Sequence, residues 1–104
     1  MKETDLVQLI RLEASKLGIT LWRNNCGKLQ DKNGRWVAYG LCVGSSDLIG
    51  IHKGRFIAVE CKSDSGVVRP EQQTFIDFIN KNGGLAGVVR SVKDFKILVD
   101  IIHQ

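Results

Sequence analysis

Asp47, Glu60 and Lys62 are charged residues in two short segments that otherwise have the apolar composition of buried strands. A Lys53-Gly54 step separates the segments and predicts a tight turn, so the two together predict a β-hairpin. Because residues equally distant from the turn lie opposite each other, Asp47 is expected to face Glu60. Side chains alternate along a strand, so Lys62 is expected on the same face as Glu60.

Two opposed carboxylates across an antiparallel strand pair repel each other, since their Cβ atoms are roughly 4.5 to 5.5 Å apart. A hard divalent cation offsets this repulsion, because Mg²⁺ is usually held by one or two carboxylates together with waters and phosphate oxygens. Lys62 would place an ammonium beside a metal-bound water or a phosphate. In the alternative interpretation, Glu60 forms an ion pair with Lys62 or another basic residue, and Asp47 caps a turn.

Gln72 is the next polar residue expected to point toward these acids. It shares the spacing i, i+3, i+4, i+7 with Phe75, Ile76 and Ile79, which predicts that it lies on the buried stripe of a helix. A buried amide must find hydrogen-bond partners, so Gln72 is a candidate site residue. Gln73 lies about 100° further round the helix and is the weaker candidate.

Glu3 extends the apolar stripe of the first predicted helix at its N-terminal end. Its spacing from Leu6, Ile10 and Leu17 favours a core-facing position, from which it could add a carboxylate to the site. The alternative is an exposed acid that is favourably placed at a helix start.

The rest of the chain predicts the elements that position these residues. Residues 24–35 are expected to form a polar, Gly-rich loop, and residues 36–43 either a strand or an ordered loop. The order αβββαβ, followed by a C-terminal helix, predicts an α/β fold with a mixed central sheet flanked by helices. The predicted segments are a helix at 4–17, strands at 19–23, 47–51 and 55–62, a helix from Pro70 to before Gly83, a strand at 85–89 and a helix at 91–102 capped by Ser91.

The composition is that of a single globular domain, with 43% apolar and 25% charged residues among 104. No apolar run approaches the roughly 18 residues of a membrane span, and residues 1–10 do not resemble a signal peptide, so a cytoplasmic setting is expected. Cys26, Cys42 and Cys61 suit neither a disulfide framework nor a zinc site by their spacing, so free thiols are expected.

The net charge of +4 makes a polyanion a plausible partner. Three basic residues lie in the long Gly-rich loop, and three lie near the hairpin turn or the start of the second helix. These six are candidate phosphate contacts, although each one alone is equally compatible with a solvated surface charge. They are Lys28, Lys32, Arg35, Lys53, Arg55 and Arg69.

The ordered set of Asp47, Glu60-Cys61-Lys62 and Gln72 resembles the PD-(D/E)XK nuclease superfamily. Within that superfamily the chain is most similar to the VRR-NUC (virus-type replication-repair nuclease) domain in its stand-alone form. One departure is Ser46, which occupies the position where many family members carry Pro before the acid. The similarity runs through WRNNCG (22–27), GSSDLIG (44–50), VECKSDSG (59–66) and RPEQQTFIDFINKNGG (69–84).

The resemblance implies a restriction-endonuclease-like core, dependence on Mg²⁺ or Mn²⁺, and cleavage of phosphodiester bonds in structured or branched DNA. Holliday-junction resolvases would be relatives, and a role in bacterial or phage replication and repair would follow. The resemblance also assigns roles to matching residues. Asp47, Glu60 and the backbone carbonyl of Cys61 would be metal ligands, Lys62 would activate or orient the attacking water, and Gln72 and Glu3 would complete the site.

Two other classes of function compete with a nuclease. A non-catalytic nucleic-acid-binding module on the same fold would have no need of opposed buried acids, and a protein-interaction module would leave the basic residues without a role. A steep salt dependence of binding would indicate phosphate contacts and separate these classes. A homodimer is also expected, because about 100 residues bury a small core and cutting two strands suits a two-fold enzyme.

Overall fold

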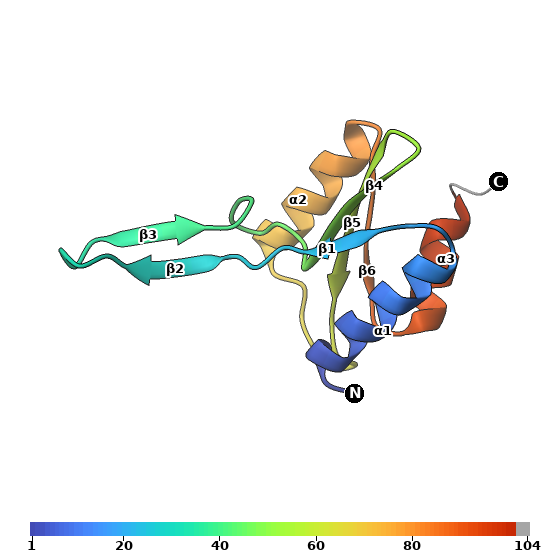
Figure 1. Ribbon diagram of the computed structural model, residues 1–104, viewed down its shortest axis with the longest axis horizontal. Helices are drawn as coiled ribbons and strands as arrows, with labels where there is room; N and C mark the ends of the chain where they lie inside the picture. The colour runs from blue at the N-terminus through green and yellow to red at the C-terminus, as the bar shows by residue number, and fades with distance from the viewer. Residues whose placement is uncertain (102–104) are drawn as a thin grey trace.

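The computed structural model describes residues 1–101, which form a four-stranded sheet, a separate two-stranded sheet and three helices (Figure 1). Apart from β2 and β3, the elements follow the predicted αβββαβ order with a C-terminal helix, so the predicted α/β fold is confirmed. Residue 102, at the end of the last predicted helix, lies outside the described residues. The elements are α1 (Glu3–Lys16), β1 (Leu21–Arg23), β2 (Gly27–Gln30), β3 (Trp36–Tyr39), β4 (Leu48–His52), β5 (Arg55–Cys61), α2 (Pro70–Lys81), β6 (Leu85–Val89) and α3 (Val92–Asp100).

The main sheet has the strand order β1-β4-β5-β6 and is mixed, because β6 runs parallel to β5 while the other pairs are antiparallel. Lys53 and Gly54 form the turn between β4 and β5 with φ values of 51° and 80°. Positive φ at both central residues is typical of the turn whose twist matches that of a hairpin. Leu48 pairs with Val59, which confirms the predicted register.

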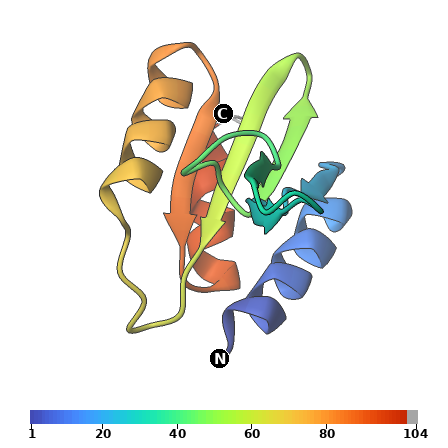
Figure 2. The same cartoon turned by 90° about the vertical axis from the view of Figure 1, so that its left-hand side faces the viewer.

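Helices cover both faces of the main sheet, with α2 on one face and α1 and α3 on the other (Figure 2). On β5, Ile57 and Val59 pack against α1 and α3, whereas Ala58 packs against Phe75 and Ile76 of α2. The apolar composition of this strand is therefore explained by burial on both faces. No helix within residues 1–101 has the length and apolarity needed to cross a bilayer.

Helix α1 ends just before Gly18, a residue type that the sequence predicts as a helix stop. The N–H of Gly18 donates to Ser15 O and that of Ile19 donates to Ala14 O, an arrangement in which Gly18 takes the left-handed conformation, with φ of 78°. The chain then turns Ile19 into the core at 1% exposure, while Leu17 stays 38% exposed. The prediction that Leu17 belongs to the buried stripe is therefore wrong.

Strands β2 and β3 form a second hairpin in a region predicted to be mainly loop. They pair only with each other and project from the body (Figure 1), so residues 27–39 are called the arm below. The arm makes the molecule 51 Å long but only 31 Å by 24 Å across. Gly27, Leu29, Val37 and Tyr39 share one face of the arm, and the other face carries Lys28, Gln30, Trp36 and Ala38.

Candidate active site

Asp47 and Glu60 lie opposite each other where the β4–β5 hairpin opens, immediately beyond the pair formed by Leu48 and Val59. The Asp47 side chain turns onto β5, where its Oδ2 accepts a hydrogen bond of 2.9 Å from the Cys61 backbone N–H. This contact fixes one carboxylate beside the end of β5. The predicted juxtaposition of the two acids follows from the register and this hydrogen bond.

Glu60 is a buried carboxyl group, only 3% exposed. Its Oε1 accepts a 3.1 Å hydrogen bond from Gln72 Nε2 and lies 3.7 Å from Lys62 Nζ. Its Oε2 is buried and has no hydrogen-bond partner within residues 1–101. Burial, and next the negative charge of Asp47, raise the pKa of Glu60 from 4.5 to about 8, while Lys62 opposes the shift.

Gln72 links the start of α2 to Glu60. Its Oε1 accepts a 2.9 Å hydrogen bond from the backbone N–H of Arg69, so the side chain caps the helix while its Nε2 orients the Glu60 carboxylate. The prediction that Gln72 points inward is confirmed by its 5% exposure. Gln73 is exposed and donates to Asp77 Oδ1 instead.

Lys62 contributes its side chain to this site, whereas Cys61 contributes only its backbone. Lys62 is 8% exposed and its ammonium lies beside Glu60, as expected for a lysine that is buried only because it is paired. The Cys61 thiol packs in the core on the opposite face, where burial, followed by the charges of Asp47, Glu60 and Glu3, raises its pKa to about 12. Only the Cys61 backbone is therefore available to the site.

Glu3 is exposed at the start of α1, so its predicted core-facing position is wrong and the alternative of an exposed acid at a helix start describes it. Its charge nevertheless acts on the Cys61 thiol, from the α1 side of the sheet. Within residues 1–101, no three His, Cys, Asp or Glu side chains come together in a way that could hold a metal ion. Glu3 thus does not join Asp47 and Glu60 as a third carboxylate in this structure, and its role at the site stays a prediction.

The donor set at the carboxylate pair fits a hard divalent cation. Glu60 Oε2 is buried with no hydrogen bond of ordinary geometry to any residue in 1–101, and a buried polar atom in that condition is costly unless something satisfies it. The second carboxylate, Asp47, is close enough to raise the pKa of Glu60 through its charge. Oxygen ligands of this kind suit Mg²⁺ or Mn²⁺, which would satisfy Glu60 Oε2 and cancel the repulsion.

Asn24 is a positioning residue that its sequence context does not single out. Its backbone N–H donates to Asp47 O at 2.8 Å, and its Nδ2 donates to Ser46 O at 2.9 Å and to Ser45 Oγ at 2.7 Å. Asn24 Oδ1 accepts from the Leu41 N–H, which joins the base of the arm to the segment that carries Asp47. The WRNNCG motif contained this residue, but its partners lie about twenty positions away.

Arg90 is a second positioning residue that no sequence signal indicated. From the end of β6, its Nη1 donates to Ser63 O at 2.6 Å and to Gly66 O at 2.8 Å. The backbone N–H of Arg90 donates in turn to Asp94 Oδ2 on α3. Arg90 therefore holds the loop that follows Lys62.

Ser46, the departure from the family pattern, is fully buried before Asp47. Its hydroxyl has no hydrogen-bond partner in the described part of the chain, so no hydrogen bond offsets the cost of burying this polar group. The surroundings of Ser46 therefore suit an apolar residue such as the Pro of the family.

Among the predicted phosphate contacts, Lys53 and Arg55 lie at the turn end of the β4–β5 hairpin. Glu60 is five residues along β5 from Arg55, roughly 17 Å away at the usual rise per residue. Arg55 Nε donates to Gly83 O, which attaches the turn to the end of α2. The structure therefore does not bring Lys53 and Arg55 to the acids.

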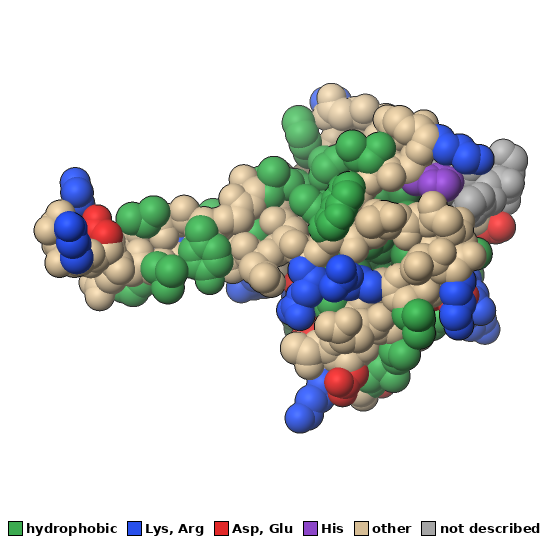
Figure 3. Space-filling model, in the orientation of Figure 1, with side chains coloured by type: hydrophobic (Ala, Val, Ile, Leu, Met, Phe, Trp, Pro, Cys, Tyr) green, Lys and Arg blue, Asp and Glu red, His purple; other side chains and the backbone are tan. Residues whose placement is uncertain are grey.

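The other four predicted contacts lie on or near the arm. Lys32 and Arg35 are at its tip, where Arg35 pairs with Asp31 at 3.4 Å, and the space-filling view shows charged side chains there with apolar ones along the arm (Figure 3). Lys28 and Arg69 line one cavity beside the start of α2. These two are the predicted contacts that the structure places closest to Gln72.

The sequence model of the VRR-NUC domain family matches residues 1–93, and no curated protein matches the chain. The matched span includes all the residues that make up the site, from Glu3 to Gln72, as well as Arg90. The restriction-endonuclease-like arrangement of a mixed sheet between helices agrees with this assignment. The chain therefore belongs to the VRR-NUC family of nuclease domains, which act on DNA and take part in its repair.

Proposed function

We propose that this domain is a divalent-metal-dependent endonuclease that hydrolyses phosphodiester bonds in structured or branched DNA, in the manner of Holliday-junction resolvases. The observation that carries the proposal is the buried Glu60 carboxyl group beside Asp47 and Lys62, with one oxygen that no hydrogen bond satisfies in the described part of the chain. Asp47, Glu60 and the Cys61 carbonyl would hold Mg²⁺ or Mn²⁺. When bound, such a cation supplies a Lewis acid for the phosphate and lowers the pKa of water.

The side chains around the cation would orient the reactants. Lys62 Nζ, 3.7 Å from Glu60 Oε1, is placed to hold the attacking water or a phosphate oxygen. Gln72 fixes the rotation of the Glu60 carboxylate, and the Cys61 N–H fixes that of Asp47. Because both carboxylates are held before substrate arrives, little reorganisation is needed during the reaction.

The positions of the basic side chains support branched DNA as the substrate. Lys28 and Arg69 lie near the site, whereas Lys32 and Arg35 lie at the tip of an arm that extends from the body. Contacts separated in this way suit DNA whose helical arms diverge from the cleavage point. We assign the reaction to replication or repair in the cytoplasm of a bacterium or a phage-infected host.

Cleavage of a panel of flap, fork, four-way and linear DNAs tests the proposed activity. We expect cutting of the branched DNAs with Mg²⁺ or Mn²⁺ and none with EDTA, and we expect Asp47→Asn to remove it, because Asp47 would be a metal ligand. Labelled strands separated on denaturing gels give the rates and the cut positions.

The same panel distinguishes the alternative function. Binding of these DNAs that weakens steeply with salt, without cleavage in either metal, would mean that the domain is a non-catalytic nucleic-acid-binding module. Equal cutting of linear and branched DNA would retain the nuclease but remove the preference for branches.

We also propose that the domain works as a homodimer whose contact is the apolar face of the arm. Leu29, Val37 and Tyr39 on this face are 64%, 50% and 46% exposed. An isolated two-stranded hairpin is marginally stable in water, so covering this face by the same face of a second copy would stabilise both arms. Burial of such side chains is worth roughly 1.5 to 3 kcal/mol each when complete.

Replacing Val37 with Lys is expected to convert the dimer to a monomer, because the charge would be buried at a two-fold contact. Light scattering after size exclusion measures the mass, and Leu12→Lys, at an exposed apolar position on α1, is the matched control. A wild-type protein of monomeric mass that still cleaves would contradict the dimer. Dissociation by Leu12→Lys alone would place the contact on α1.

A further inference from the structure

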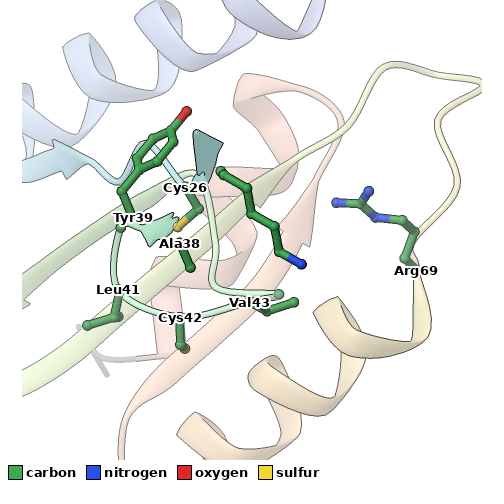
Figure 4. A pocket seen from close by; sticks show the side chains of 11 residues that line it. Cys26, Ala38, Tyr39, Leu41, Cys42, Val43 and Arg69 are labelled. Carbon is green, nitrogen blue, oxygen red and sulfur yellow. The ribbon is translucent and has the colours of Figure 1, made fainter. Parts of the chain in front are cut away.

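A cavity of about 520 Å³ lies between the base of the arm, the loop of residues 40–44 and the start of α2. Figure 4 shows Arg69 beside the start of α2 on one side of the cavity, and Leu41, Cys42 and Val43 along the loop on the other side. The volume falls in the range of about 300 to 1,000 Å³ in which small molecules are bound. The nuclease reaction described above does not use this cavity.

The charged side chains that line the cavity are both positive. Lys28 from β2 and Arg69 from the start of α2 line it, and no Asp or Glu does. Arg69 Nε lies 3.3 Å from Glu71 Oε1, but its side chain remains 66% exposed, and no ion pair joins Lys28 to any other residue within 1–101. Two cations facing one space favour an anionic ligand.

Part of the cavity wall is apolar. Ala38, Leu41 and Val43 contribute aliphatic side chains to it, and Tyr39 also lines the cavity (Figure 4). A site for a phosphate ion alone would have no use for this surface. The ligand that matches both parts has an anionic group and a flat apolar group, which is the chemistry of a nucleotide.

The cavity is held in shape by close backbone contacts. Gly44, with φ of 83°, packs so tightly that an added Cβ would lie 2.4 Å from Glu71 O, and Gly40, with φ of 93°, would place one 2.7 Å from Asn25 O. The Ser45 hydroxyl donates to Cys42 O at 2.6 Å. The loop therefore needs little reordering when a ligand binds.

The cavity adjoins the carboxylate pair through Arg69. The backbone of Arg69 donates to Gln72 Oε1, and Gln72 Nε2 donates to Glu60 Oε1. A ligand phosphate held by Arg69 would thus be two hydrogen bonds from Glu60. This separation suits a nucleotide that neighbours the cleaved bond.

We infer that this cavity binds one unpaired nucleotide of the DNA strand beside the cleavage point, with its phosphate between Lys28 and Arg69 and its base against Ala38, Leu41 and Val43. The strand must be unpaired because a base inside a duplex is stacked and cannot enter a pocket. The inference rests on the proposed nuclease function. It adds that the feature of branched DNA recognised by the domain is an unpaired nucleotide. A flap, fork or junction supplies such a nucleotide, whereas an intact duplex does not.

Binding of fluorescein-labelled (dT)6, measured by anisotropy in EDTA, tests this inference without requiring cleavage. Lys28→Ala and Arg69→Gln remove the cations, and Ala38→Ile fills the cavity without changing the charge. We expect each to weaken binding about fivefold or more, whereas Lys93→Ala on α3, a matched loss of one charge, changes it less than twofold. Ala38→Ile is expected to leave the affinity for a fully paired duplex unchanged.

Full (dT)6 affinity in Ala38→Ile, or an equal loss in Lys93→Ala, would overturn the cavity as the binding site. Equal losses for (dT)6 and duplex in Ala38→Ile would overturn the requirement for an unpaired nucleotide. Thermal melts establish that each variant is folded. Cleavage by the wild type in Mn²⁺ is scored separately, so a nuclease without this site and a binding site without nuclease activity give different results.

Discussion

Replacing Glu60 with Gln is expected to raise the melting temperature of the metal-free protein at pH 9 while abolishing DNA cleavage. The substitution keeps an oxygen that can accept from Gln72 Nε2, but it removes a buried negative charge opposite Asp47. Cross-strand pair contributions are roughly 0.2 to 1 kcal/mol, and burial enlarges this one. Each 1 kcal/mol corresponds to about 4 to 8 °C in a domain of this size.

The same substitution should change how stability depends on pH. The pKa of Glu60 is raised by burial and by Asp47 from 4.5 to about 8, so the folded state binds this proton more tightly than the unfolded state. The resulting stabilisation is complete below about pH 4.5 and is lost as the pH rises through about 8. Wild type should therefore lose on the order of a few kcal/mol across this window relative to Glu60→Gln.

Excess Mn²⁺ should reverse the order of the two melting temperatures, so that wild type melts above Glu60→Gln. By binding the folded state, excess Mn²⁺ should raise the melting temperature of wild type, and it should have little effect on Glu60→Gln. Melts of both proteins at pH 9, with EDTA and with Mn²⁺, supply the four values, and Asp5→Asn is a control for loss of an exposed acid. If Glu60→Gln melts below wild type in EDTA and gains as much from Mn²⁺, Glu60 is only a structural ion-pair partner.

Replacing Lys62 with Ala is expected to reduce the single-turnover rate of cleavage by about 10² or more, the range seen when a positioned proton-transfer group is lost. The variant should still be stabilised by Mn²⁺, because Asp47 and Glu60 remain. The loss of rate is thereby separated from a loss of metal binding. Rates on one branched DNA in Mg²⁺, beside those of Lys93→Ala, make the measurement.

Two outcomes would show that the metal-dependent site is wrongly assigned. One is a Lys62→Ala protein that cuts as fast as wild type, and the other is undiminished cutting by wild type in excess EDTA. A variant that loses both its rate and its response to Mn²⁺ would mean that Lys62 acts by holding Glu60 in place, 3.7 Å away.

The part of the site that local rules determine could be predicted from the sequence. The Lys53-Gly54 turn fixes the register of β4 and β5, and the alternation of side chains then places Glu60 opposite Asp47. Gln72 followed from helical spacing, and its burial agrees with the prediction. Each of these inferences needed only residues close together in the chain.

The parts that depend on distant contacts could not be predicted. The side chains of Asn24 and Arg90 act through partners 17 to 27 residues away, and a polar residue in a strand or loop carries no mark of its partner. Strand β2 of the arm was missed because GKLQ (27–30) packs neither face on the core, so it lacks the apolar run by which buried strands are recognised. Strand β3 falls within residues 36–43, for which a strand was one of the two predicted alternatives. Leu17 was misplaced because the end of α1 turns Ile19 inward instead.

The attachment of the arm bears on how this domain can diversify. Strands β1 and β4 pair directly with each other, and Asn24 joins the points where the chain leaves and re-enters the main sheet. Doubling the length of a closed loop costs only about 0.6 kcal/mol. An exchange of the arm for a longer, shorter or unrelated segment thus leaves the strand register intact, and selection for new substrates can work on it while the hydrolytic chemistry is inherited unchanged.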